Sequence, residues 1–198
     1  MISLNGYGPL NAKKAAKKII KNQVSCLISF GFAASCDDSI KSGAIVIPKN
    51  IIWRNSSKNQ TSITLRKKII KKLSSNNFSS KNMYSSKNII YSIDKKNKIS
   101  TKFNVSCIDM ESEDIQKIAK KNRLPFVAVR IVIDDLKLEI PQFILKATKA
   151  NGETNYLLIL LGIIRKPTSL INIFRLGLHY YSGLRKLKVL GKLIFNNF

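Results

Sequence analysis

The chain has 198 residues, of which 44% are hydrophobic, and this is enough for one domain with a sizeable core. It carries 35 lysine and arginine residues against 11 aspartate and glutamate residues, which gives a formal net charge of +24. The lysines are spread along the whole chain, with no repeated spacing and no nucleic-acid-binding motif. The composition therefore argues against specific nucleic-acid binding and predicts only loose, salt-sensitive attraction to anions.

Several classes of site and location are also excluded by the residues present. No apolar run is long enough to span a bilayer, and the N-terminus lacks a signal-peptide layout, so we expect a cytoplasmic protein. The three cysteines, Cys26, Cys36 and Cys107, form no CxxC pair, and His179 is the single histidine. We therefore expect no metal site and no His-based catalytic triad.

The first half of the chain predicts helices alternating with strands. Pro9 suits the first turn of a helix whose apolar positions, Ala12, Ala15, Ala16, Ile19 and Ile20, recur at helical spacing. Buried strands are predicted over 24–30 and 44–48, with a loop over 31–39 between them. Leu65, Ile69 and Leu73 then mark a second helix. The stretch 74–88, rich in Ser, Asn and Lys from Ser74 to Ser86, is predicted to be a mobile surface loop.

The second half continues the alternation and becomes less regular after Asp134. Strands are predicted over 88–93 and 104–108, and Asn151-Gly152 reads as a turn followed by a strand over 156–164. From 168 to 198 we predict a basic amphipathic helix, whose apolar face carries Leu170, Ile173, Phe174, Leu178 and Tyr181. This helix either closes the core or adheres to an anionic membrane surface.

Two apolar segments that each end in carboxylates are the most informative feature of the sequence. They run from Ser106 to Ser112 and from Pro125 to Asp134, and a helical pattern on Ile115, Ile118 and Ala119 joins them. Ligands of open α/β sheets bind at the carboxyl ends of strands, so Glu111 and Asp134 could face one pocket, one accepting hydrogen bonds from hydroxyl groups and the other donating a proton. The alternative is that each acid is a helix N-cap or turn residue.

The alternation predicts one α/β domain over 1–198 with helices on both faces of its sheet. The Asp-Met-Glu-Ser and Pro-Phe-Val-x-Val-Arg-x-x-x-Asp segments resemble the signature of the purine nucleoside phosphorylase and nucleosidase superfamily. The resemblance extends to Gly6-Tyr7-Gly8-Pro9 and to Leu27–Ala33. It implies a three-layer αβα fold around a twisted, mixed central sheet. The family's first strand and its glycine loop should precede Gly6, so that N-terminal strand is expected to be missing.

The resemblance also implies roles for individual residues. Asp134 corresponds to the acid that protonates the purine N7, and burial beside Ile133 would have to raise its pKa. Glu111 corresponds to the acceptor for ribose hydroxyls. Further substrate-binding positions implied by the resemblance are Met110 at the sugar, Ile89 and Ile90 at the adenine edge, and the strand segment Gly31, Phe32 and Ala33. The alternative for Ile89 and Ile90 is that both are structural residues of the core without a role in binding.

Within the superfamily, the Ser-Phe-Gly-Phe-Ala segment and Lys166-Pro167 with its following basic helix look most like the hopanoid-associated phosphorylases. That resemblance implies release of adenine from adenosyl-hopane, with no cofactor, and leaves open whether phosphate or water is the nucleophile. It also implies a homo-oligomer that touches the inner membrane at its periphery. The competing hypotheses are an inactive, truncated remnant and a basic module that binds membranes or nucleic acid.

Overall fold

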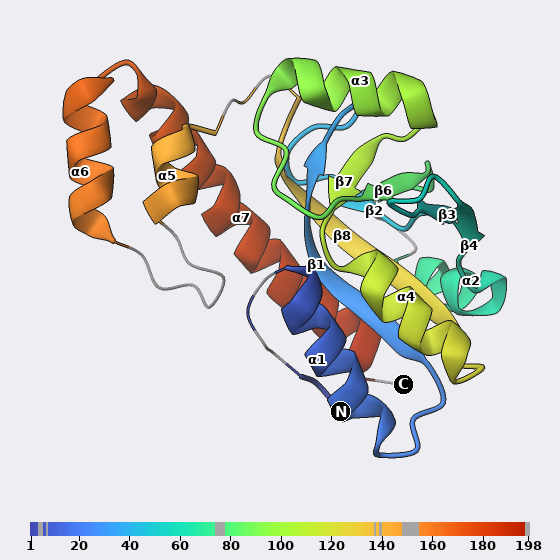
Figure 1. Ribbon diagram of the computed structural model, residues 1–198. Coiled ribbons are helices and arrows are strands. Elements are labelled where there is room, and N and C mark those ends of the chain that lie inside the picture. Colours follow the sequence, from blue (N-terminus) through green and yellow to red (C-terminus); the bar gives the residue numbers. More distant parts are fainter. Residues whose placement is uncertain are drawn as a thin grey trace.

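A computed structural model describes residues 1–3, 6, 8–73, 78–136, 138, 140–147 and 155–196, and places a single mixed sheet at the centre of the fold (Figure 1). The sheet has eight strands in the order β4-β3-β6-β7-β1-β8-β2-β5. The strands are β1 (Leu27–Ser35), β2 (Ile45–Val46), β3 (Asn50–Ile52), β4 (Lys58–Gln60), β5 (Phe78–Ser79), β6 (Met83–Ser85), β7 (Cys107–Asp109) and β8 (Phe126–Asp134).

Helices cover both faces of this sheet. They are α1 (Pro9–Ile20), α2 (Ile63–Lys72), α3 (Ile93–Phe103), α4 (Ser112–Lys121), α5 (Gln142–Ala147), α6 (Tyr156–Arg165) and α7 (Ser169–Phe195). Figure 1 shows α1 and α4 in front of the central strands and α7 behind them. The predicted three-layer fold with a mixed central sheet is confirmed.

The two longest strands, β1 and β8, form the middle of the sheet. They pair in parallel from Leu27 opposite Phe126 to Ala33 opposite Val132. Almost every residue of β8 is buried, as expected for a strand that has helices on both of its faces. A bulge follows, because Ala34 pairs with Asp134 and leaves Ile133 as the extra residue of β8.

Two apolar clusters lie on opposite faces of the β1–β8 pair. On one face, Ala128 and Val132 pack with Ala16 of α1 and Ala119 of α4. On the other face, Val127 and Val129 pack with side chains of α2 and α7, including Ile69, Leu190 and Ile194. Since one strand serves both clusters, the position of β8 determines where all four helices lie.

The predicted N-terminal helix begins at Pro9 as expected, and Ala12 and Ala16 are its buried residues. The predicted helices over Leu65–Leu73 and Ile115–Ala119 correspond to α2 and α4. In α4, acids occupy the first turn and lysines the last, which is the arrangement that the helix dipole favours.

Several predicted strand boundaries were wrong. β1 continues through Ser35, so the first five residues of the loop expected over 31–39 are strand. The strand expected over 88–93 is absent, because residues 88–92 are irregular and Ile93 begins α3. The strand expected over 44–48 is the two-residue β2, and that over 104–108 is β7. Within the predicted loop 74–88, residues 78–79 form β5, which pairs with β2. Residues 83–85 form β6, which pairs with β3 and β7. Residues 74–77 lie outside the described residues.

The largest error concerns residues 156–164, which were predicted to be a strand and form helix α6. A short, uninterrupted apolar run has no periodicity that separates a strand from a helix. The cap at Asn155 favours the helix, because its side chain accepts a hydrogen bond from the Leu158 backbone N–H. The turn predicted at Asn151-Gly152 lies outside the described residues.

The predicted C-terminal helix is α7, but only part of it closes the core. Leu190 and Ile194 are buried, and Phe195 packs edge-on against Phe30 with ring centroids 5.4 Å apart. Four residues of the predicted apolar face are only partly covered or open: Leu170, Phe174, Leu178 and Tyr181 are between 48% and 69% exposed. The first turns of α7 stand away from the sheet together with α5 and α6 (Figure 1).

Two glycines of α7 allow a matched test of where this helix touches the sheet. A Cβ at Gly183 would lie 2.6 Å from the Ile133 side chain, whereas a Cβ at Gly177 would meet nothing within 4 Å. We expect Gly177→Ala to raise the free energy of unfolding by about 1 kcal/mol through helix propensity. In Gly183→Ala, overpacking of about 1–3 kcal/mol opposes that gain. Urea unfolding of both variants measures the difference, and equal stabilisation would show that α7 does not press on β8 at Gly183.

Candidate active site

The first group of site residues surrounds a buried arginine of β8. Arg130 is 2% exposed, and its guanidinium donates to the Asp109 Oδ2 from Nε at 3.0 Å and from Nη2 at 2.6 Å. Its Nη2 also donates to the hydroxyls of Ser29 at 2.6 Å and Ser112 at 3.0 Å. The cation is therefore neutralised and hydrogen-bonded between β1, β7 and the start of α4, as a buried charge requires.

Glu111 lies beside this group, at the junction of β7 and α4. Its Oε1 accepts a hydrogen bond of 2.9 Å from the Gly8 backbone N–H, and its Oε2 lies 3.9 Å from Arg130 Nη2. Burial and, secondarily, the Asp109 charge raise the pKa of Glu111, although Arg130 opposes them. Glu111 therefore joins the N-terminus of α1 to the end of β7 and keeps a partly exposed carboxylate.

Gly8 brings Met110 into the same group. It has a φ of 92°, and a Cβ on it would lie 3.7 Å from the Met110 ε-methyl group. The positive φ, which favours glycine, lets the Gly8 N–H point at Glu111, and the Met110 methyl group lies at van der Waals distance from this position. The structure thus brings together Met110 and Glu111, the two residues predicted to hold a sugar.

The second group forms around Asp134, which is 3% exposed. Its Oδ2 accepts a hydrogen bond of 2.8 Å from the Lys96 ammonium, while its Oδ1 is buried and has no hydrogen-bond partner among the described residues. Burial raises the pKa of Asp134 to about 6, against the opposing effect of Lys96. The predicted upward shift is confirmed, and its cause is desolvation.

Lys96 was not predicted to be part of the site. It is 0% exposed, and its ammonium also donates to the backbone carbonyls of Asp135 at 3.2 Å and Leu138 at 3.3 Å. These contacts hold α3 against the segment that follows β8. A signal was present in the sequence, because Lys96 lies three residues after Ile93 and seven before Phe103, on the apolar stripe of the helix.

The two acids lie at the ends of strands that run in opposite directions, β7 for Glu111 and β8 for Asp134. β1 is parallel to β8 but antiparallel to β7, so Glu111 and Asp134 do not follow the same edge of the sheet. Glu111 approaches Arg130, which precedes Asp134 by four residues or roughly 13 Å of extended strand. The stretch of β1 from Gly31 to Ala34 lies between these two levels, since Gly31 pairs with Arg130 and Ala34 with Asp134.

The other predicted positions are divided between the two faces of the sheet. A Cβ at Gly31 would lie 3.6 Å from Arg130 Nη1, and Ala33 is buried in the cluster beneath α1 and α4. Phe32 points the other way and packs against Tyr180 of α7, with ring centroids 5.4 Å apart. Ile90 packs against a small core cluster, and Ile89 is half-buried next to it in an irregular segment.

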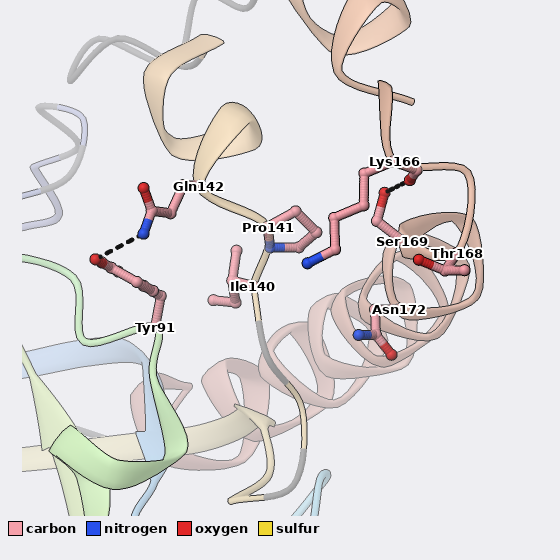
Figure 2. A pocket seen from close by; sticks show the side chains of 8 residues that line it. All are labelled: Tyr91, Ile140, Pro141, Gln142, Lys166, Thr168, Ser169 and Asn172. Atoms are coloured by element: carbon pink, nitrogen blue, oxygen red, sulfur yellow. Dashed lines mark hydrogen bonds between the residues drawn. The ribbon is translucent and has the colours of Figure 1, made fainter. Parts of the chain in front are cut away.

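A cavity of about 400 Å³ lies between the segment after Ile90 and the start of α7 (Figure 2). Tyr91 and Gln142 line one side and are joined by a hydrogen bond of 3.0 Å. The remaining lining residues are Ile140, Pro141, Lys166, Thr168, Ser169 and Asn172. Neither Glu111 nor Asp134 lines this cavity, which lies between Tyr91 and the start of α7.

The described residues include no group of three or more His, Cys, Asp or Glu that could hold a metal ion. In the same residues, no helix is long and apolar enough to cross a membrane. Cys107 and Cys36 are buried thiols whose pKa values are raised by desolvation, to about 12 for Cys36.

The Arg130–Asp109 pair gives a stability test of this site. We expect Arg130→Met to cost about 3–5 kcal/mol of unfolding free energy, because it leaves the Asp109 carboxylate buried without its counter-ion. Asp109→Asn should cost a similar amount, and the double variant should cost less than the sum. The exposed pair Lys41–Asp38, 3.7 Å apart, is the control, and Lys41→Met should cost at most about 1 kcal/mol. Additive losses in a urea-unfolding cycle would contradict the coupling.

Solved structures with this architecture come from several bacteria. The chain superimposes on a futalosine hydrolase from Helicobacter pylori with a TM-score of 0.62 at 14% identity, covering 67% of this chain and 65% of that one. It therefore spans slightly less than two thirds of that relative's length. A 5'-methylthioadenosine/S-adenosylhomocysteine nucleosidase from Neisseria meningitidis gives 0.61 at 22% identity, with 68% of each chain covered.

A nucleosidase of the same description from Helicobacter pylori gives a TM-score of 0.64 at 13% identity, covering 94% of this chain and 76% of that one. No curated protein matches the sequence significantly. A family model described as the phosphorylase superfamily matches residues 1–160. By that match, and by the fold on which its two acids are placed, this chain belongs to the phosphorylase superfamily.

Proposed function

We propose that this protein cleaves the N-glycosidic bond of an adenosylated substrate and releases adenine, with adenosyl-hopane as the favoured substrate. The observation that carries the proposal is the arrangement of Asp134. A buried carboxyl with a pKa near 6 and one unpartnered oxygen can hold a proton and donate it.

Glycosidic cleavage builds positive charge on the sugar and electron density on the departing base. In the proposed reaction, Asp134 donates its proton from Oδ1 to the purine N7 as the C–N bond breaks, and the electron pair of that bond stays with adenine. The Lys96 ammonium on Oδ2 stabilises the carboxylate that remains. Glu111 accepts hydrogen bonds from the ribose hydroxyls, and its negative charge stabilises the developing cation.

The remaining proposed contacts follow the resemblance and the placement of the side chains. Met110 packs on the sugar beside Gly8, Gly31 and Ala33 line the strand between the two acids, and Ile89 and Ile90 bind the adenine edge through their backbone. Phe32 serves this proposal only through its backbone, because its ring packs on α7. The nucleophile is water or a phosphate co-substrate, and no other cofactor is proposed.

The lipid substrate and a peripheral membrane location are proposed from the second half of the chain. The cavity of about 400 Å³ connects Tyr91, which follows Ile90, to the helices that expose apolar side chains. A bulky apolar substrate needs such a surface next to the sugar site. We also propose that the chain forms a homo-oligomer, as the resemblance implies.

A binding protein without activity is the second candidate. It is favoured by two contacts that the acids already make: Lys96 forms an ion pair with Asp134, and the Gly8 backbone N–H donates a hydrogen bond to Glu111. In that state Asp134 is an acceptor and donates nothing. The two candidates differ in turnover, so assays for adenine release with the full chain distinguish them.

The first functional prediction concerns the acid itself. Asp134→Asn keeps the shape of the side chain but cannot supply the proton, so adenine release should fall about 10²-fold or more. The matched control is Asp38→Asn, which makes the same change at an exposed carboxylate that pairs with Lys41 rather than with Lys96. Both are measured by chromatographic detection of adenine from an adenosyl substrate, and unchanged release in Asp134→Asn would remove the proposed acid.

The second functional prediction is a pH dependence with a defined sign. Only protonated Asp134 can donate, so activity should fall as the pH rises through about 6. Lys96 lowers this pKa, so Lys96→Met should raise it and move the falling limb to higher pH. Lys98→Met, an exposed lysine of the same helix, should leave the limb in place. Thermal melts establish that the variants are folded, and a limb that does not move in folded Lys96→Met would contradict the coupling.

A further inference from the structure

An apolar surface without a partner covers α6 and the first half of α7. We call it the α6–α7 surface. Its side chains are large and open to solvent: Tyr156, Leu157, Leu160 and Ile164 on α6 are 54–79% exposed, and Ile171 and Phe174 on α7 are 68% and 69% exposed. Figure 1 shows these helices at one end of the molecule, apart from the sheet. Isolated exposed leucines are ordinary, but this many large exposed apolar side chains on two consecutive helices indicate an interaction surface.

Helix α6 is the clearest part of this surface. Nine of its ten residues are apolar or glycine, and only Gly162 is buried. A Cβ at Gly162 would lie 2.3 Å from the Phe143 ring, so α6 is seated tightly on α5 by that one position. The helix is therefore fixed to the fold on one side and presents its leucines and isoleucines outward.

The charge around the surface selects the partner. The sequence from 155 to 198 contains seven lysine and arginine residues and no aspartate or glutamate. Arg165 and Lys166 end α6, and Arg175 and Arg185 follow on α7, all of them exposed. Apolar side chains bordered by cations are the composition that binds anionic lipid surfaces.

The same charge disfavours a second copy of the chain as the occupant. A two-fold interface brings the same patch together from both subunits, so it would juxtapose these cations without any acid to pair with them. A membrane-spanning role is also disfavoured, because the ten residues of α6 extend about 15 Å and a bilayer core is about 30 Å thick. Contact at the level of the lipid headgroups satisfies both constraints.

We propose that the α6–α7 surface docks this protein on an anionic phospholipid membrane, with the α6 side chains entering the interface and the arginines and lysines contacting headgroup phosphates. The cavity bounded by Lys166, Ser169 and Tyr91 lies at the junction of α6 and α7, next to this surface. The docking proposal deepens the proposed action on an adenosylated lipid substrate and rests on it. The docking test contains no such substrate, so the failure of either proposal is recognised separately.

The experiment is co-sedimentation of the full chain with vesicles of phosphatidylcholine alone or mixed with phosphatidylglycerol. We expect binding to the mixed vesicles and at least about tenfold weaker partition onto the neutral ones. The variant Leu157→Gln/Ile164→Gln replaces two exposed apolar side chains of α6 by glutamine, which is a good helix former. It should weaken partition onto the mixed vesicles by about tenfold or more. The matched control, Leu10→Gln/Ile63→Gln, makes the same change at exposed positions of α1 and α2 and should stay within about twofold of wild type.

A second pair of variants separates specific docking from the general positive charge. Arg165→Gln/Arg175→Gln should weaken binding to mixed vesicles more than Lys13→Gln/Lys17→Gln, two exposed lysines of α1, although both lose the same charge. Equal losses in the two pairs, or wild-type binding by folded Leu157→Gln/Ile164→Gln, would overturn the proposal. So would a wild-type dimer in lipid-free solution that the α6 variant converts to a monomer, because a second copy would then cover the surface.

Discussion

The fold depends on how one buried strand accommodates two charged side chains. β8 runs through the centre of the sheet, apolar on both faces, yet Arg130 and Asp134 are both nearly inaccessible to solvent. A charge in such a place must be paired and hydrogen-bonded. Each therefore requires an opposite charge from another part of the chain: Asp109 for Arg130 and Lys96 for Asp134. These two pairs join β7 and α3 to the strand that already orders α1, α2, α4 and α7.

The pairs also divide the candidate site into two chemically different halves. Around Arg130, the cation is satisfied by Asp109 and two serines, so it acts as a fixed positive centre that orients Glu111. Around Asp134, desolvation outweighs the pairing and the carboxyl keeps a raised pKa. Desolvation raises the pKa of both acids, but their contacts differ. Glu111 accepts a hydrogen bond from the Gly8 N–H and lies beside Arg130, whereas Asp134 keeps one oxygen without a partner among the described residues. The bulge at Ile133 directly precedes Asp134 in β8.

The sequence predicted those features that arise from local pattern and failed where tertiary context decides. Pro9, the spacing of Leu65 and Ile69, and the acid-to-lysine order of α4 are local signals, and each predicted helix is present. The run 156–164 has no local periodicity that identifies a helix, and the contacts that accompany its helical form are the Asn155 cap and the close approach of Gly162 to Phe143. Asp134 and Glu111 were predicted from their motif and remain predictions as site residues, whereas Lys96 was missed because a lysine on an apolar stripe indicates an ion pair only when a buried acid is known to lie beside it.

Helix α7 shows how the core and the projecting surface can be parts of one element. Its last turns are held by Leu190, Ile194 and the Phe30–Phe195 contact, and Lys72 donates to the Ile194 carbonyl at 2.8 Å. At Gly183 the helix comes close enough to Ile133 that no side chain fits between them. N-terminal to that point the helix leaves the sheet and its apolar residues become exposed. Because Ile133 is the bulge residue directly before Asp134, the close approach at Gly183 places α7 next to the end of β8 that carries this acid.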